Sequence, residues 1–215
     1  MSRSALVLPV AVLCICCLGV LQAGGVVVIY QASIEFSGGA PPAGPTPWLT
    51  VRYDDGGASG SVTMTFTATN LVGSEFVSGL YLNVVPSMDP NALTFGSPVK
   101  TGSFTSPAIH RGTDAFKADG DGYFDILLRF ATSGGEAGRF TAADAVSYTI
   151  TGPASLTAAS FAARSASRGT GYPIAAHVQG IGTDGCLSGW VTVPEPASLS
   201  LLALGCLTAI RRRPH

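Results

Sequence analysis

The central part of this 215-residue sequence contains almost no cysteine. Of the five cysteines, three lie within residues 14–17 and one is Cys206 near the carboxyl end, so only Cys186 stands between the end segments. A single thiol cannot form an internal disulfide, and the central part must be stable through its hydrophobic core alone. No spacing directs Cys186 toward His177, so we expect an incidental or buried thiol and not a Cys-His nucleophile.

Charged residues are also scarce, at 12% of the chain. Residues 24–196, which remain once both end segments are set aside, carry 8 basic and 13 acidic groups and a net charge of −5. They contain no basic cluster and no stripe of alternating aromatic and basic residues. This mild acidity argues against nucleic acid as a partner.

Motifs that would identify an enzyme are missing. There is no Gly-x-Ser-x-Gly elbow, no His-Glu-x-x-His pair and no glycine loop of the kind that cradles phosphate. The residues that a metal site, a catalytic triad or a glycosidase carboxylate pair would need occur without directed spacing: His110, His177, Asp114, Asp184, Asp121, Asp125 and Glu136. We therefore expect no enzymatic activity.

What the sequence does have is an apolar segment at each end. At the amino end, Arg3 precedes the uncharged run Ala5–Leu21, and Ala23 is a small residue suited to signal peptidase. This arrangement predicts a signal peptide over residues 1–23, cleaved after Ala23. An uncleaved signal anchor is the alternative.

At the carboxyl end, the motif Pro194-Glu195-Pro196 precedes the uncharged run Ala197–Ile210 and then Arg211, Arg212 and Arg213. Proline is tolerated in the first turn of a helix, so this motif suits a helix start. The helix would rise ~21 Å against a hydrocarbon core of about 30 Å, which suits a transient stop in the membrane. The other interpretations are an interfacial helix and a buried core helix. Three consecutive arginines argue against burial, and they place the body outside by the positive-inside rule.

These three elements, in this order, resemble the PEP-CTERM sorting signal of Gram-negative bacteria. The resemblance covers residues 193–215 and implies a sorting motif, a transmembrane helix and a cytoplasmic stop. It also implies processing by an exosortase and export through the inner membrane. The protein would then reside in the cell envelope, at the surface or in the extracellular matrix.

Residues 24–192 have the length of one domain and a residue pattern typical of an all-β fold. Ser61–Asn70 is the clearest strand, because apolar residues alternate with threonines along it. Glycine- or proline-containing segments separate most of the other predicted strands: Val26–Phe36, Trp48–Tyr53, Phe76–Val85, Phe124–Ala131, Ala145–Thr151, Thr157–Ala163, Ile174–Ile181 and Gly189–Val193. The pattern predicts a single β-sandwich or jelly roll, with one helical turn at Ala142–Asp144.

Four segments of this body also resemble ectodomains that are often found upstream of PEP-CTERM tails: Asp119–Asp125, Gly138–Thr141, Val146–Gly152 and Ala175–Gly180. This second resemblance implies a β-sandwich of undefined activity and brings no catalytic residues with it.

Asp119, Asp121 and Asp125 are the sharpest candidate for a metal site. Together with the glycine that follows Asp121 they resemble the inner part of a calcium loop. With that glycine at loop position six, however, a lysine and a leucine occupy the first and last positions, where carboxylates are required. We therefore favour a tight Asp-Gly turn that enters a strand, and expect no cofactor, with calcium as the alternative.

Six aromatic residues leave room for a binding function: Trp48, Trp190, Tyr53, Tyr81, Tyr123 and Tyr172. Aromatic rings on an open sheet face would stack on sugars, whereas buried rings would be ordinary core. The main hypothesis is therefore an exported, exosortase-processed surface or matrix protein with a structural or adhesive role. The alternative is a carbohydrate-binding module associated with exopolysaccharide.

Overall fold

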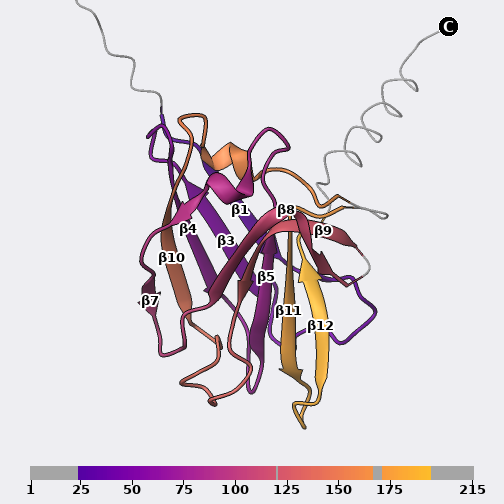
Figure 1. Ribbon diagram of the computed structural model, residues 1–215. Helices are drawn as coiled ribbons and strands as arrows, with labels where there is room; N and C mark the ends of the chain where they lie inside the picture. The colour runs from indigo at the N-terminus through magenta and orange to yellow at the C-terminus, as the bar shows by residue number, and fades with distance from the viewer. Residues whose placement is uncertain (1–23, 120, 167–170, 195–215) are drawn as a thin grey trace, which may run out of the picture.

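The computed structural model describes residues 24–119, 121–166 and 171–194 (Figure 1). These residues form two six-stranded sheets packed face to face, which confirms the predicted all-β class and a sandwich-like arrangement. The predicted signal peptide, the tail helix and most of the sorting motif lie outside the described residues. Among the described helices, none has the length and apolar character needed to cross a bilayer.

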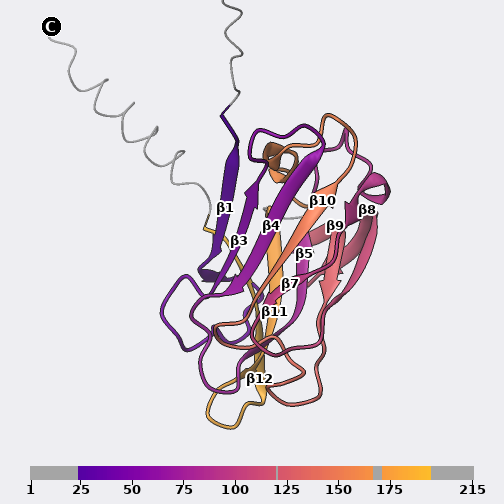
Figure 2. The same ribbon diagram turned by 90° about the vertical axis from the view of Figure 1, so that its left-hand side faces the viewer.

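The first sheet has the order β1-β3-β4-β10-β6, with β7 also paired to β10. Its strands are β1 (Val27–Ala32), β3 (Leu49–Asp54), β4 (Ser61–Ala68), β6 (Thr94–Phe95), β7 (Val99–Thr101) and β10 (Ala145–Thr151). Figure 2 shows β1, β3, β4 and β10 side by side in front of the second sheet. In β4 the alternation is as predicted: the apolar side chains are buried, and the threonines lie on the outer, wetter face.

The second sheet has the order β2-β12-β11-β5-β9-β8 and is antiparallel throughout. Its strands are β2 (Ile34–Glu35), β5 (Phe76–Leu82), β8 (Ala108–Ala118), β9 (Gly122–Arg129), β11 (Ile174–Ile181) and β12 (Leu187–Thr192).

The predicted strand Val26–Phe36 divides between the two sheets. β1 pairs with β3 in the first sheet, and β2 pairs with β12 in the second. Ser33, between them, donates its backbone N–H to the Thr192 carbonyl oxygen at 2.8 Å. The chain therefore turns a corner of the sandwich here and joins the two sheets along one edge.

Two local predictions are wrong. Thr157–Ala163 is not a strand, because it contains the 3₁₀ helix η2 (Ala158–Phe161). The Ser160 hydroxyl accepts the Thr157 N–H at 3.1 Å, and Phe161 stacks on the ring of Tyr53 with centroids 4.3 Å apart. Local side-chain hydrogen bonding and this packing outweigh the weak strand preference of an alanine-rich segment.

Ala142–Asp144 is a tight turn and not a helical one. Ala143 has a positive φ of 64°, outside the helical region. The Asp144 carboxylate accepts the Thr141 N–H at 2.7 Å, which closes the turn through a side chain.

The longest strand of the fold, β8, was not predicted from the sequence. Most of its residues are exposed, and its pairing with β9 shifts between Arg111 and Phe116. An edge strand with an irregularity of this kind shows no two-residue period. The short strands β6 and β7 and the 3₁₀ helix η1 (Pro90–Ala92) were also missed.

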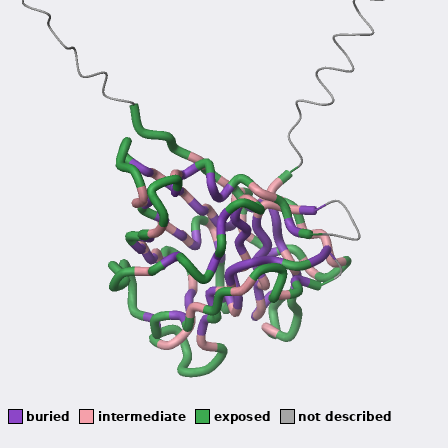
Figure 3. Tube along the Cα trace, turned by 45° about the horizontal axis from the view of Figure 1, so that its top comes forward, coloured by how far each residue is buried: buried purple, intermediate pink, exposed green. Residues whose placement is uncertain are grey.

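The core lies between the two sheets, and the loops carry most of the exposed residues (Figure 3). Phe66 stacks on Phe140 with ring centroids 4.8 Å apart, and Phe130 packs against both. Trp48 is 6% exposed and donates its indole N–H to the Gly44 carbonyl oxygen at 2.7 Å. Dense aromatic packing of this kind stabilises the sandwich without a disulfide among the described residues.

Candidate functional site

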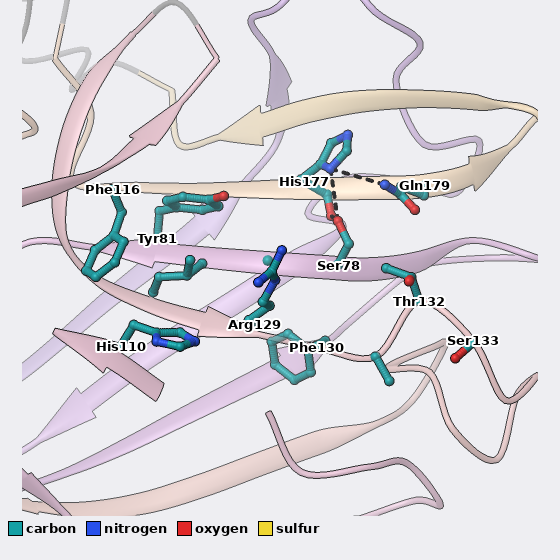
Figure 4. Close-up of a pocket in the computed structure, with 13 residues that line it drawn as sticks. Ser78, Tyr81, His110, Phe116, Arg129, Phe130, Thr132, Ser133, His177 and Gln179 are labelled. Carbon is teal, nitrogen blue, oxygen red and sulfur yellow. Dashed lines mark hydrogen bonds between the residues drawn. The ribbon is translucent and has the colours of Figure 1, made fainter. Parts of the chain in front are cut away.

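A groove of about 810 Å³ runs over the outer face of the second sheet (Figure 4). Strands β5, β9 and β11 form its floor, β8 contributes one wall, and the loop after β9 closes the far end. The side chains that carry its chemistry are Ser78, Tyr81, His110, Phe116, Arg129, His177 and Gln179. Its volume lies within the range of small-molecule sites.

The wall exists because the β8–β9 hairpin curls over the sheet. β8 contacts β11, although β5 and β9 separate the two strands in the sheet order. Figure 1 shows the hairpin curving across β5 and β11. Its tip supplies Ala118 and Phe124 to a second apolar cluster with Ala175, and Tyr81 and Trp190 pack against that cluster. The tip is therefore held in place by packing on the outer face.

A β-bulge in β5 shapes the floor. His177 pairs with Gly79 and Val178 pairs with Val77, so Ser78 is the extra residue. Gly79 also leaves room for Tyr81, since a Cβ there would lie 2.9 Å from ring carbon Cε2 of the tyrosine. Bulges of this kind re-aim side chains, and this one turns the Ser78 hydroxyl toward His177.

His177 is the most constrained polar residue in the groove. Its Nδ1 lies 2.9 Å from the Ser78 Oγ and 3.4 Å from the Gln179 amide nitrogen. Its ring stacks on Trp190, the cross-strand neighbour on β12, with centroids 4.6 Å apart and planes at 18°. Because an amide N–H₂ group only donates, Nδ1 accepts, and the proton of the neutral ring lies on Nε2.

Burial lowers the pKa of His177, and the opposing influence of Asp119 is the smaller one. The imidazole is therefore neutral near pH 7. A neutral ring with Nδ1 already engaged presents Nε2–H as a hydrogen-bond donor for a ligand. Nε2 itself makes no hydrogen bond to the part of the chain that the structure describes.

The predicted aromatic residues divide between the core and the outer face. Trp48 and Tyr53 are buried in the main core, so they do not form an open binding face. Trp190 and Tyr81 lie on the outer face of the second sheet, with ring centroids 5.2 Å apart. Tyr123 is 45% exposed outside the groove. Tyr172 packs against Phe36.

Two of the three aspartates of the calcium hypothesis accept hydrogen bonds from the protein. Asp121 accepts hydrogen bonds from the Ser165 hydroxyl at 2.8 Å and from the Gly171 N–H at 3.2 Å. Asp125 accepts the N–H groups of Val84 and Asp114 at 3.0 and 2.9 Å. Asp121 therefore ties Ser165 and Gly171 to the turn before β9, and Asp125 ties β9 to β8 and to the segment after β5. Across residues 24–119, 121–166 and 171–194, no group of three metal-binding side chains comes together.

The structure brings two predicted candidates to one site and separates the rest. His110 and His177 both line the groove, although 66 residues lie between them in the sequence. Asp184 instead accepts the backbone N–H of Cys186, whose thiol is exposed, in the loop between β11 and β12. Glu136 lies exposed in the loop after β9.

No family model, no characterised protein and no solved structure matches this chain. The function is therefore argued from the geometry of the groove and from the two end segments of the sequence.

Proposed function

We propose that this is an exported surface or matrix protein whose β-sandwich binds carbohydrate in the outer-face groove and does not catalyse a reaction. The geometry of the groove supports the carbohydrate-binding part of the proposal. The export part is supported by the signal-peptide pattern and by the sorting motif at Pro194, Glu195 and Pro196 with its terminal arginines. An exosortase would be its processing partner.

The chemistry of the groove suits sugars because apolar rings and polar donors alternate along it. Tyr81 and Phe116 offer faces on which the C–H side of a pyranose ring stacks. The Nε2–H of His177 and the amide of Gln179 lie on the neighbouring strand, where hydroxyl groups of the same sugar would reach them. This combination fits a saccharide better than a purely apolar ligand.

A hydrolase is the alternative function that the geometry of Ser78 and His177 raises. The contact between the Ser78 hydroxyl and His177 is the kind of pair that activates a nucleophile. The same hydroxyl also lies 3.3 Å from the His177 carbonyl oxygen. This contact is expected of a hydroxyl that donates a hydrogen bond to the backbone at the bulge. We infer a structural role for Ser78.

Affinity electrophoresis of the purified full chain through gels that contain exopolysaccharide tests this function. His177→Phe keeps a ring against Trp190 but removes both nitrogens, and Gln179→Ala removes the amide. Each is expected to weaken binding about three- to tenfold, the worth of one or two hydrogen bonds. Tyr123→Ala is the control, because this exposed tyrosine lies outside the groove.

Equal retardation of all variants and the wild type would remove the groove from the proposal. Shortening of the polysaccharide that stops in Ser78→Ala would identify a hydrolase and contradict the non-catalytic reading.

A further inference from the structure

The groove differs in charge from residues 24–196 taken as a whole. None of the described residues that line it is an aspartate or glutamate, although acids outnumber bases in residues 24–196. Among the described lining residues, Arg129 is the one permanent cation, and Figure 4 draws it in the middle of the groove, between Tyr81 on one side and Ser78 on the other. A locally positive surface on an acidic protein points to an anionic ligand.

Arg129 is exposed. It makes no hydrogen bond or ion pair with the part of the chain that the structure describes. Burial raises the pKa of Tyr81, and the charge of Arg129 opposes this rise to a smaller extent. A guanidinium beside an aromatic ring, with its donors unused, is suited to a bidentate carboxylate.

Among the described residues, no carboxylate lies within ion-pair distance of Arg129. Asp119, the carboxylate that acts on His177, lies in the turn between β8 and β9, at the opposite end of β9 from Arg129. The single ion pair among the described residues, Arg52 with Asp54 at 2.6 Å, lies on the first sheet. Arg129 is therefore available to a ligand in a way that Arg52 is not.

The groove also continues beyond Arg129. A neighbouring hollow of about 510 Å³ shares Thr132 and Gln179 with it and contains both Arg139 and Asp184. Arg139 lies over the ring of Phe76, 4.3 Å from its centroid, and donates its Nε–H to the Thr132 carbonyl oxygen. A second fixed cation along the same track suits a polymer better than a single sugar.

The geometry points to a polysaccharide with carboxylate-bearing sugars, a polyuronate, as the ligand of this groove, with Arg129 pairing to a uronate carboxylate. This inference rests on the proposed carbohydrate-binding function and adds the class of sugar. A sugar ring stacks on Tyr81 and Phe116 whether or not it carries a carboxylate. Arg129 is therefore the residue that selects the charged sugar.

The test compares polygalacturonate with its fully methyl-esterified form, which has the same rings without charge, by calorimetry on the purified full chain. The wild type is expected to bind the acid at least tenfold more tightly, and salt is expected to reduce the difference. Arg129→Gln should lose this preference at unchanged melting temperature. Arg52→Gln, the same charge change on the other sheet, should keep it.

Equal binding of acid and ester, unaffected by Arg129→Gln, would overturn the polyuronate inference and leave the carbohydrate-binding function standing. Parallel losses in Arg129→Gln and Arg52→Gln would also overturn it, because net charge alone would then explain the preference. Binding of neither polymer, nor of neutral exopolysaccharide, would overturn both proposals.

Discussion

Tyr148 illustrates, at the scale of a single residue, how burial alone sets side-chain chemistry. It is 2% exposed in the core, and its hydroxyl has no hydrogen-bond partner among the described residues. Burial raises its pKa to about 12. A partnerless buried hydroxyl reduces stability, because it loses its hydration and gains nothing in exchange.

We therefore expect Tyr148→Phe to raise the free energy of unfolding by about 1 kcal/mol, measured by urea denaturation. The substitution removes the hydroxyl and keeps the ring that packs against Phe95. A loss of 1 kcal/mol or more would show that the hydroxyl makes a stabilising hydrogen bond and would contradict this prediction.

Asp55 is a second residue whose environment determines its titration. Its carboxylate accepts the N–H groups of Gly57, Val26 and Ala158 at 3.0, 2.7 and 3.1 Å. These hydrogen bonds, that of Gly57 first, lower its pKa below the usual value. Because the pKa is lower in the folded than in the unfolded state, the stabilisation is complete above the unfolded value. It is lost as pH falls through the folded value.

Asp55→Asn should accordingly destabilise the protein at neutral pH and make little difference in acid. The measurement is the denaturation midpoint of both forms between about pH 7 and pH 2.5. An equal gap at both ends of that range would contradict a charge-based role for Asp55.

At the scale of elements, β-bulges shape the strands that form the floor of the groove. A second irregularity, where β11 pairs with β12, lies between Gln179 and Ile181. Gly180 has a φ of +76° there, and a Cβ on it would lie 2.2 Å from the Ser74 carbonyl oxygen. Only glycine fits this position without movement of the backbone.

Gly180→Ala should cost about 3 kcal/mol of unfolding free energy, through the left-handed conformation and the clash together. Gly73→Ala is the matched control, because Gly73 also has a positive φ, of +59°, but open space around it. About 1 kcal/mol is expected there. Similar losses in both variants, measured by thermal melting, would show that the contact at Gly180 is unimportant.

The strands also differ in how well the sequence predicts them. Regular strands such as β4 were predictable, because alternation along one strand is a local property. β8 was not, because its exposure and its pairing shift removed the alternation. The groove was not predictable either, because it depends on three strands meeting across the sheet and on a hairpin that curls over them. A weak cue existed in Ser78-Gly79, two small residues that interrupt the apolar pattern of β5.

At the scale of the whole molecule, the β-sandwich lies between two apolar end segments of the sequence. The intact mass of protein taken from its native host tests the export part. We expect the first 23 residues and everything after the Pro-Glu-Pro region to be missing. Alanine in place of Pro194, Glu195 and Pro196 should leave the carboxyl-terminal segment attached. A wild-type mass that retains Arg211–Arg213 would indicate a simple membrane-anchored ectodomain.

The central claim is that the outer face of the second sheet is where this protein meets carbohydrate. Hydroxyl-radical footprinting with and without the exopolysaccharide of its own host tests the claim most directly. We predict that oxidation of His110, Phe116 and His177 falls in the presence of the polysaccharide while that of Tyr123 stays unchanged. Protection confined to the first sheet, or no protection at all, would contradict it.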